Sequence, residues 1–102
     1  MVQAIVSRAA PAVQDFAGFL KILRPGLPAR DHVLLLLYQR GREGAEFQQL
    51  NQWARLSMRG NLRRTLDRLT NSVDLAHFDG QRYFITRRGE LDVESRRLLE
   101  AS

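Results

Sequence analysis

Residues 55–69 read R-L-S-M-R-G-N-L-R-R-T-L-D-R-L, and this stretch decides how we interpret the chain. Its apolar side chains recur at spacings of four, four and three residues, which is one face of a helix: Met58, Leu62, Leu66 and Leu69. Ser57 stands just before them, and a serine hydroxyl is a good N-cap because it accepts hydrogen bonds from the first helical turn. The pattern predicts a helix that begins after Ser57 and packs its leucines into a core.

The opposite face of this helix is polar. At about 100° per residue it carries Gly60, Arg64, Asp67 and Asn71, with Arg63 on one flank and Asn61 and Arg68 on the other. Arg55 and Arg59 lie nearer the apolar edge. One face therefore anchors the helix, and the other presents arginines, an asparagine and a glycine to an anionic partner.

The positive charge of the chain is concentrated around this stretch. The formal net charge is +5, and residues 54–88 contain eight arginines against three aspartates, so this third of the sequence holds the whole excess. The remainder has eight basic and eight acidic residues. Such a local excess is the electrostatic pattern expected for binding a polyanion.

Length and composition exclude several classes of protein. A chain of 102 residues with 44% hydrophobic and 26% charged residues is typical of one globular domain. Cysteine is absent, which excludes disulfides and thiolate metal sites. The longest apolar run, Val33–Tyr38, is too short to span a membrane, and Met1–Ala10 does not resemble a secretory signal. We expect a soluble, cytoplasmic protein without a cofactor.

The residues before Arg55 predict three helices. Met1–Ala10 is interpreted as a tail or an arm. Pro11 can open a helix whose apolar residues, Val13, Phe16, Leu20 and Leu23, keep helical spacing until Pro25–Gly26. Ala29–Arg40 is the next helix, ended by Gly41 and apolar on every side from Val33 to Leu37, so it should be central and buried. Ala45–Ala54 forms the third, and its tight connection to Ser57 is typical of a helix-turn-helix.

After Leu69 the period changes to that of strands. Thr70–Ser72 is expected to end the helix, and Val73–Phe78 and Gln81–Thr86 should pair across a two-residue type I′ turn at Asp79–Gly80. Thr86 can then cap a last helix, Arg87–Glu100. Its inward residues should be Leu91, Leu98 and Leu99, with Val93 off their stripe.

This order of elements resembles the winged helix-turn-helix transcriptional regulators, in particular the multiple-antibiotic-resistance-regulator type. The resemblance lies in Leu27–Leu37 (L-P-A-R-D-H-V-L-L-L-L), in Leu50–Leu69 and in Tyr83–Glu90 (Y-F-I-T-R-R-G-E). It implies an α+β, mostly helical fold: a single winged helix-turn-helix domain over residues 1–102, with flanking helices at both ends and a two-stranded hairpin as the wing. Residues 1–26 would form the N-terminal arm and helix, 27–86 the winged core, and 87–102 the C-terminal helix.

The same interpretation assigns roles on DNA. Asn61 can contact adenine, and Arg63 or Arg64 guanine, each contact discriminating by about 1–3 kcal/mol. Gly60 has no side chain, so it lets the helix backbone approach a phosphate or a base closely. Arg55, Arg59 and Arg68 suit phosphate contacts, and we count Ser57, at the start of the helix, with this surface. Arg82 beside the wing tip can reach a minor groove or its phosphates, and Arg87 and Arg88 follow at the base of the wing.

The sequence therefore predicts a sequence-specific protein that binds double-stranded DNA, most simply a transcriptional repressor on a palindromic site. A homodimer is expected through the helices around Phe16–Leu23 and Leu91–Leu99, because one recognition helix gives limited specificity. Two alternatives are a winged-helix module for protein–protein interaction and a plasmid or phage DNA-handling protein for partition or replication. Catalytic motifs are absent, so no enzyme is expected. His32 and His77 are interpreted as structural rather than as metal ligands.

Overall fold

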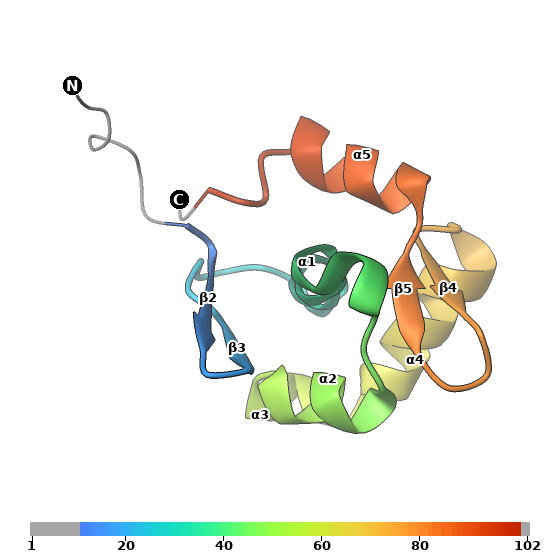
Figure 1. Ribbon diagram of the computed structural model, residues 1–102, viewed down its shortest axis with the longest axis horizontal. Helices are drawn as coiled ribbons and strands as arrows, with labels where there is room; N and C mark the ends of the chain where they lie inside the picture. The colour runs from blue at the N-terminus through green and yellow to red at the C-terminus, as the bar shows by residue number, and fades with distance from the viewer. Residues whose placement is uncertain (1–10, 101–102) are drawn as a thin grey trace.

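The computed structural model describes residues 11–100, which form an α+β domain with two small antiparallel hairpins (Figure 1). Met1–Ala10, the predicted tail or arm, lies outside the described residues. The elements follow in this order: β2 (Val13–Phe16), β3 (Phe19–Ile22), α1 (Ala29–Arg40), the 3-10 turn η1 (Gly41–Glu43), α2 (Phe47–Trp53), α3 (Leu56–Arg59), α4 (Leu62–Asp67), the π-helical turn η2 (Arg68–Ser72), β4 (Ala76–Phe78), β5 (Tyr83–Ile85) and α5 (Arg87–Ser95).

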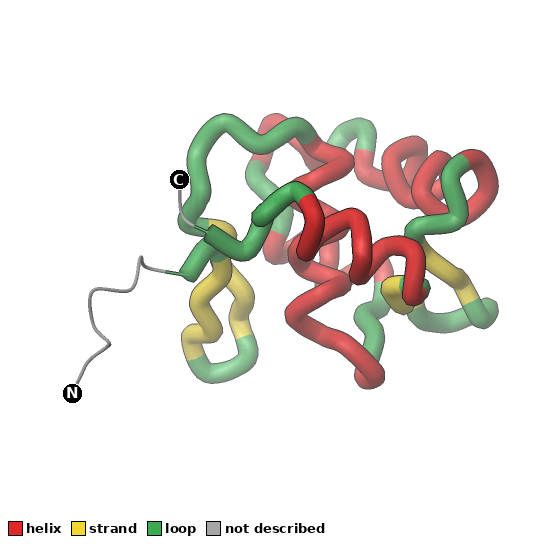
Figure 2. Tube along the Cα trace, turned by 90° about the horizontal axis from the view of Figure 1, so that it is seen from above, coloured by secondary structure: helices red, strands yellow, loops and turns green. Residues whose placement is uncertain are grey.

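Helix α1 is the centre of the fold, as its sequence predicted. Residues 33–37 are completely buried. In Figure 1, α5 lies above α1, and α2 and α3 lie below it. The β2–β3 hairpin lies to the left of α1, and the β4–β5 hairpin lies to the right. Figure 2 shows the same separation of the two hairpins from a second direction. A helix that is apolar on all sides needs cover on all sides, and these elements supply it.

The predicted N-terminal helix is wrong, because residues 13–22 form the β2–β3 hairpin. Its register pairs Val13 with Ile22 and Phe16 with Phe19. The chain turns at Ala17 and Gly18, both with positive φ, and the Asp15 carboxylate accepts a hydrogen bond from the Gly18 N–H. The apolar residues fit the helical period and the strand period equally well, and the two-residue turn decides between them.

The predicted helix from Ser57 to Leu69 is interrupted. Ser57 is not an N-cap: Arg55 takes that position, and Ser57 lies inside the single turn of α3. The chain leaves the helix at Gly60–Asn61, where Asn61 has φ −111° and ψ 11°, and α4 then begins at Leu62. Glycine and asparagine are both poor helix formers, which explains the break. The leucine face is confirmed, since Leu62, Leu66 and Leu69 are all buried.

The expected break at Thr70–Ser72 is also wrong, because the backbone continues as the π-helical turn η2. The Thr70 hydroxyl donates to the carbonyl oxygens of Leu66 and Asp67, and the Val73 N–H reaches back to the Arg68 carbonyl. The wider turn lengthens the exposed helical surface that follows α4.

The second hairpin is where the sequence placed it, but its turn differs. Phe78 pairs with Tyr83, and the bends lie at Gly80–Gln81 instead of Asp79–Gly80, with positive φ only at Gly80. Ala45, expected in a helix, forms an antiparallel bridge with Tyr83. Gly44 permits this approach: its φ is +66°, and a Cβ there would meet the Phe84 ring at 2.5 Å.

Helix α5 ends at Ser95, short of the predicted Glu100. Val93 is fully buried and Leu91 is 51% exposed, so the expectation is wrong for these two residues, whereas Leu98 is buried and Leu99 packs against the core as expected. Arg97 adopts positive φ, and the Leu98 N–H bonds to the Val93 carbonyl. This is the pattern of a Schellman C-cap, in which the two residues joined in this way also make an apolar contact.

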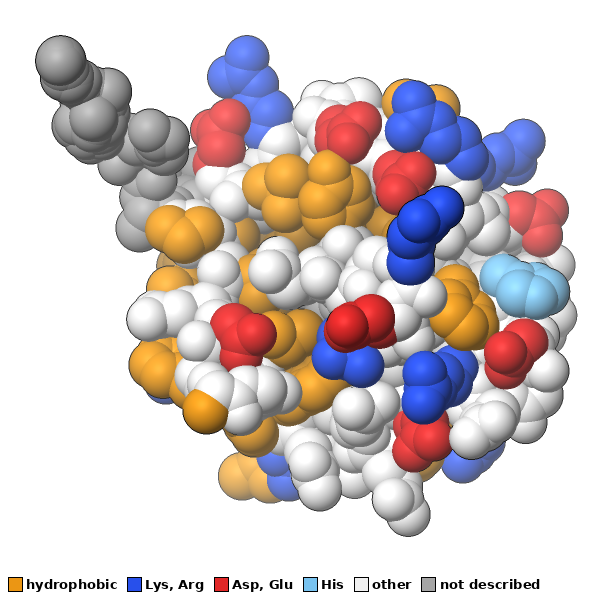
Figure 3. Space-filling view, in the orientation of Figure 1, with side chains coloured by type: hydrophobic (Ala, Val, Ile, Leu, Met, Phe, Trp, Pro, Cys, Tyr) orange, Lys and Arg blue, Asp and Glu red, His pale blue; other side chains and the backbone are white. Residues whose placement is uncertain are grey.

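Large apolar side chains remain exposed at one end of the molecule. In Figure 3 they gather over the left side, where β2 and β3 lie, while the right side mixes acidic and basic residues. None of the helices within residues 11–100 has the length and apolar character needed to cross a lipid bilayer.

Candidate nucleic-acid interface

Helix α4 presents its polar face to solvent, between the start of α1 and the β4–β5 hairpin. Asn61, Arg63, Arg64, Asp67 and Arg68 are exposed, while the leucines on the other face are buried. A hollow borders α4 on each side, one shared with α1 and one shared with β4 and β5. The two hollows differ in charge.

The hollow toward α1 is basic. It has a volume of about 370 Å³, and its polar lining comes from Arg30, Asn61, Arg64, Thr65 and Arg68. No carboxylate is among its lining residues. The Arg30 guanidinium lies 3.5 Å from the Asp31 carboxylate and 3.9 Å from that of Asp92, whereas the side chains of Arg64 and Arg68 make no hydrogen bond or ion pair within residues 11–100. We call this hollow the basic notch.

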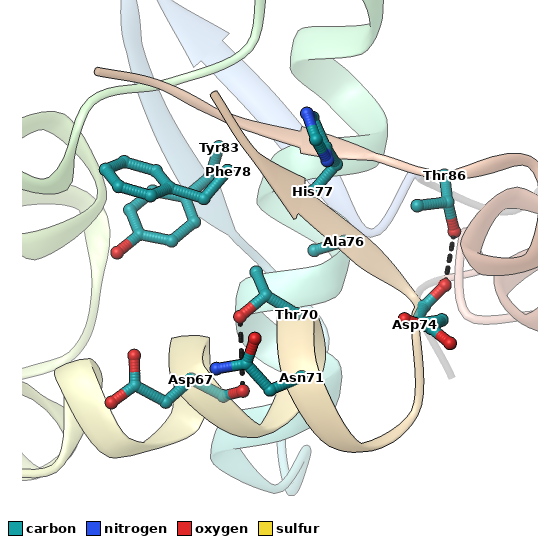
Figure 4. A pocket seen from close by; sticks show the side chains of 9 residues that line it. All are labelled: Asp67, Thr70, Asn71, Asp74, Ala76, His77, Phe78, Tyr83 and Thr86. Atoms are coloured by element: carbon teal, nitrogen blue, oxygen red, sulfur yellow. Dashed lines mark hydrogen bonds between the residues drawn. The ribbon is translucent and has the colours of Figure 1, made fainter. Parts of the chain in front are cut away.

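The hollow toward the hairpin is acidic (Figure 4). Its volume is about 320 Å³, and Asp67 and Asp74 line it together with Asn71 and His77. The rings of Phe78 and Tyr83 stack at 4.4 Å on its far side. Two carboxylates repel phosphate groups, so polyanion contact is favoured on the side of the basic notch.

Three predicted arginines near the start of the segment already hold contacts within the protein. Arg59 donates to the carbonyl oxygens of Gln52 and Ala54, both at 3.1 Å, and so ties α3 to the end of α2. Arg63 stacks over the Phe47 ring of α2 at 4.1 Å. Arg55 donates to the Arg24 carbonyl at 3.2 Å. Their guanidinium groups serve the fold, and the charge of Arg55 and Arg63 is still exposed to solvent.

The backbone between α3 and α4, at Gly60 and Asn61, is exposed to solvent. Gly60 is exposed, and a Cβ built on it would meet nothing within 4 Å. Asn61 precedes α4 with its side chain exposed and makes no capping hydrogen bond. Ser57 is exposed on α3. Of these three residues, Asn61 lines the basic notch, and Gly60 directly precedes it in the chain.

The predicted wing residues divide into two places. Arg82 lies beside the tip and donates to the Glu43 carbonyl at 3.3 Å. The Asp79 carboxylate holds the tip by accepting from the N–H groups of Arg82 and Gln81, both at 2.8 Å, and these bonds lower the pKa of Asp79. Arg87 and Arg88 begin α5 at the other end of β5, where Arg87 pairs with Glu90 at 3.4 Å.

The structure thus groups Asn61, Arg64 and Arg68 and adds a residue that sequence reasoning missed. Arg30, in the first turn of α1, lines the basic notch with them. Apart from its charge, the sequence contains no signal that brings Arg30 to α4, since the two are more than thirty positions apart. Asn71, His77 and the two aspartates of the acidic hollow were likewise not predicted as neighbours.

Within the described range, 11–100, no group of three or more histidine or acidic side chains is placed to hold a metal ion. Comparison with protein-family models, with curated proteins and with solved structures found no match to this chain.

Proposed function

We propose that the protein is a winged-helix protein that binds double-stranded DNA in a sequence-specific manner. The observation that supports this proposal most is the basic notch. Arg30 of α1 and Arg64 and Arg68 of the α4 segment line this hollow together, and no carboxylate is among its lining residues. In this assignment the β4–β5 hairpin is the wing, and α2 to α4 form the helix-turn-helix.

The major groove of B-form DNA, roughly 12 Å wide, accepts a helix such as α4. Asn61 directly precedes α4 and Arg64 lies in its first turn, where side chains reach base edges, and they suit adenine and guanine respectively. Arg30 and Arg68, on the notch side, contact the phosphates along one strand. The backbone at Gly60, with no side chain in the way, approaches the same strand closely.

The wing contributes less than the sequence suggested. Its tip is short and held by Asp79, and the acidic hollow separates it from α4. Arg82 remains the wing residue best placed for a neighbouring phosphate. Repulsion from Asp67 and Asp74 directs the duplex toward α1, so the charges determine on which side of α4 the DNA backbone lies.

We further propose that the protein acts as a repressor and reads a palindromic site as a homodimer. A single short recognition helix gives limited specificity, and two-fold pairing is the common remedy. Half of the expected interface, a helix at 16–23, is replaced by a hairpin. Leu91, exposed on α5, remains a candidate contact. Sedimentation at micromolar concentration tests this part, and a monomer at all concentrations, with and without DNA, contradicts it.

Selection of bound fragments from a pool of random duplexes tests DNA binding directly. We expect an enriched site, and we expect its affinity to fall at least about a hundredfold between roughly 50 and 200 mM salt, because several phosphates are neutralised. Enrichment of no sequence, or binding that is insensitive to salt, contradicts the proposal.

A further inference from the structure

We propose that a second surface, distant from the β4–β5 hairpin, docks an acidic peptide segment of a partner protein that carries bulky apolar side chains. The surface is a groove between β3 and the segment from α2 to α3. It has a volume of about 400 Å³, and its lining includes Phe19, Lys21, His32, Trp53, Arg55 and Leu56. We call it the hairpin groove.

Apolar side chains are exposed in the hairpin groove, and two further exposed apolar residues, Phe16 and Leu23, are close to lining residues in the hairpin or in the chain. Leu56 is 79% exposed and Phe19 45%. Phe16, 50% exposed, pairs with Phe19 across the hairpin, and Leu23, 37% exposed, precedes Arg24, whose carbonyl Arg55 contacts. Figure 3 shows apolar side chains gathered on this side of the molecule. Because the apolar surface extends past the hollow, an extended occupant covers it better than a compact small molecule does.

The charge of the hairpin groove selects the partner. Its charged lining residues are all cations: Lys21, Arg55 and Arg59. Asp15 is the one acidic residue of the hairpin, and it lies on β2 with its carboxylate bonded to the Gly18 N–H. Cations beside exposed leucine and phenylalanine side chains complement carboxylates alternating with apolar residues, whereas a nucleic acid backbone gains nothing from apolar contacts.

A buried polar atom at the base of the groove points the same way. His32 is 1% exposed, and its Nδ1 has no hydrogen-bond partner among the residues that the structure describes. Native proteins pair nearly all such atoms, so one that borders a groove is consistent with a site completed by a ligand.

Trp53 supplies the measurement, because it is the only tryptophan in the chain and it lines the groove. The probe is a synthetic acetylated octapeptide, Glu-Asp-Phe-Asp-Asp-Leu-Leu-Glu, titrated into the full chain while Trp53 emission is recorded. The control peptide replaces every acidic residue by lysine. We expect saturable binding of the acidic peptide, at least about tenfold weaker binding to Leu56→Asp, and unchanged binding to Arg97→Ala, which lowers the net charge by the same single unit at an exposed position outside the groove.

Three results of the peptide titration would overturn the proposal. They are the absence of saturable binding, equal binding of the lysine peptide, and equal binding to Leu56→Asp. A second copy of the chain is the competing occupant: if Leu56→Asp converts a sedimenting dimer into a monomer, the groove belongs to self-association and the proposal is wrong. Affinity of Leu56→Asp for the selected duplex is measured alongside. Retained DNA binding with lost peptide binding separates the two surfaces and supports both assignments.

Discussion

At the scale of single residues, His32 makes the stability of the fold depend on pH. His32 belongs to α1, and its imidazole is buried. Burial is the larger cause, and the positive charge of Arg55 the smaller one, that lowers the pKa of His32 from 6.5 to about 4. The unfolded chain therefore binds a proton that the folded chain does not bind between these values. The stabilisation is complete above pH 6.5 and is lost as the pH falls toward 4.

We therefore predict that the free energy of unfolding decreases by about 3 kcal/mol between pH 7 and pH 4 through this residue alone. Urea unfolding at a series of pH values measures the decrease. His32→Leu should flatten the dependence over this range, because the proton acceptor is removed. If His32→Leu keeps the full slope, other groups are responsible.

Gly60 allows a test that separates stability from binding. Its φ of −64° is helical, and a Cβ meets nothing, so Gly60→Ala should stabilise the protein by about 0.5–1 kcal/mol. The same methyl group stands where the DNA backbone approaches in our proposal, so affinity for the selected duplex should fall. Urea unfolding and a duplex titration measure the two effects. A stabilised variant with unchanged affinity shows that Gly60 does not face DNA.

The burial of single residues was predictable where one local period governed it. Leu62, Leu66 and Leu69 are buried as their spacing required. The contacts of Arg59 and Arg63 were not predictable, because their partners lie in α2 or at its end and depend on how α3 and α4 pack against it. An arginine on an exposed helical face looks the same in sequence whether it faces a phosphate or a carbonyl oxygen.

At the scale of elements, turns rather than apolar spacing caused the errors. The residues of β2 and β3 satisfy a helical period, and the deciding feature, positive φ at Ala17 as well as Gly18, is unusual for alanine. In α5 the positive φ of Arg97 directs Leu98 back to Val93. Neither positive φ follows from the spacing of the apolar residues.

The end of α5 is joined to α1 by an ion pair whose acidic partner is buried. The Asp31 side chain is 7% exposed and pairs with Arg96, which also bonds to the more exposed Asp92 at 2.9 Å. We predict that Asp31→Asn lowers the free energy of unfolding by about 2–3 kcal/mol, because the buried side of the Arg96 guanidinium loses its counter-charge. Asp92→Asn should lower it by less than about 1 kcal/mol. Equal decreases in the free energy of unfolding, measured with urea, would contradict the larger contribution that we assign to Asp31.

At the scale of the whole molecule, the two sides of α4 have opposite character. The basic notch and the acidic hollow flank the same helix, and under our proposal this asymmetry draws the duplex toward α1 and away from the base of the hairpin. The sequence predicted that the excess charge gathers in residues 54–88. It did not predict this asymmetry, because Arg30 reaches α4 only through the packing of α1, and Asp74 reaches the hollow only through η2 and β4.

The most direct test of the account compares two arginine-to-alanine variants that remove the same charge from different places. Arg64→Ala alters the exposed face of α4, whereas Arg97→Ala alters an exposed arginine beyond α5 whose side chain pairs only weakly with Glu100, at 3.9 Å. Affinity for the selected duplex should fall at least about tenfold for Arg64→Ala and by no more than about twofold for Arg97→Ala. Equal effects of the two substitutions would show that only net charge matters, and the recognition face proposed for α4 would be wrong.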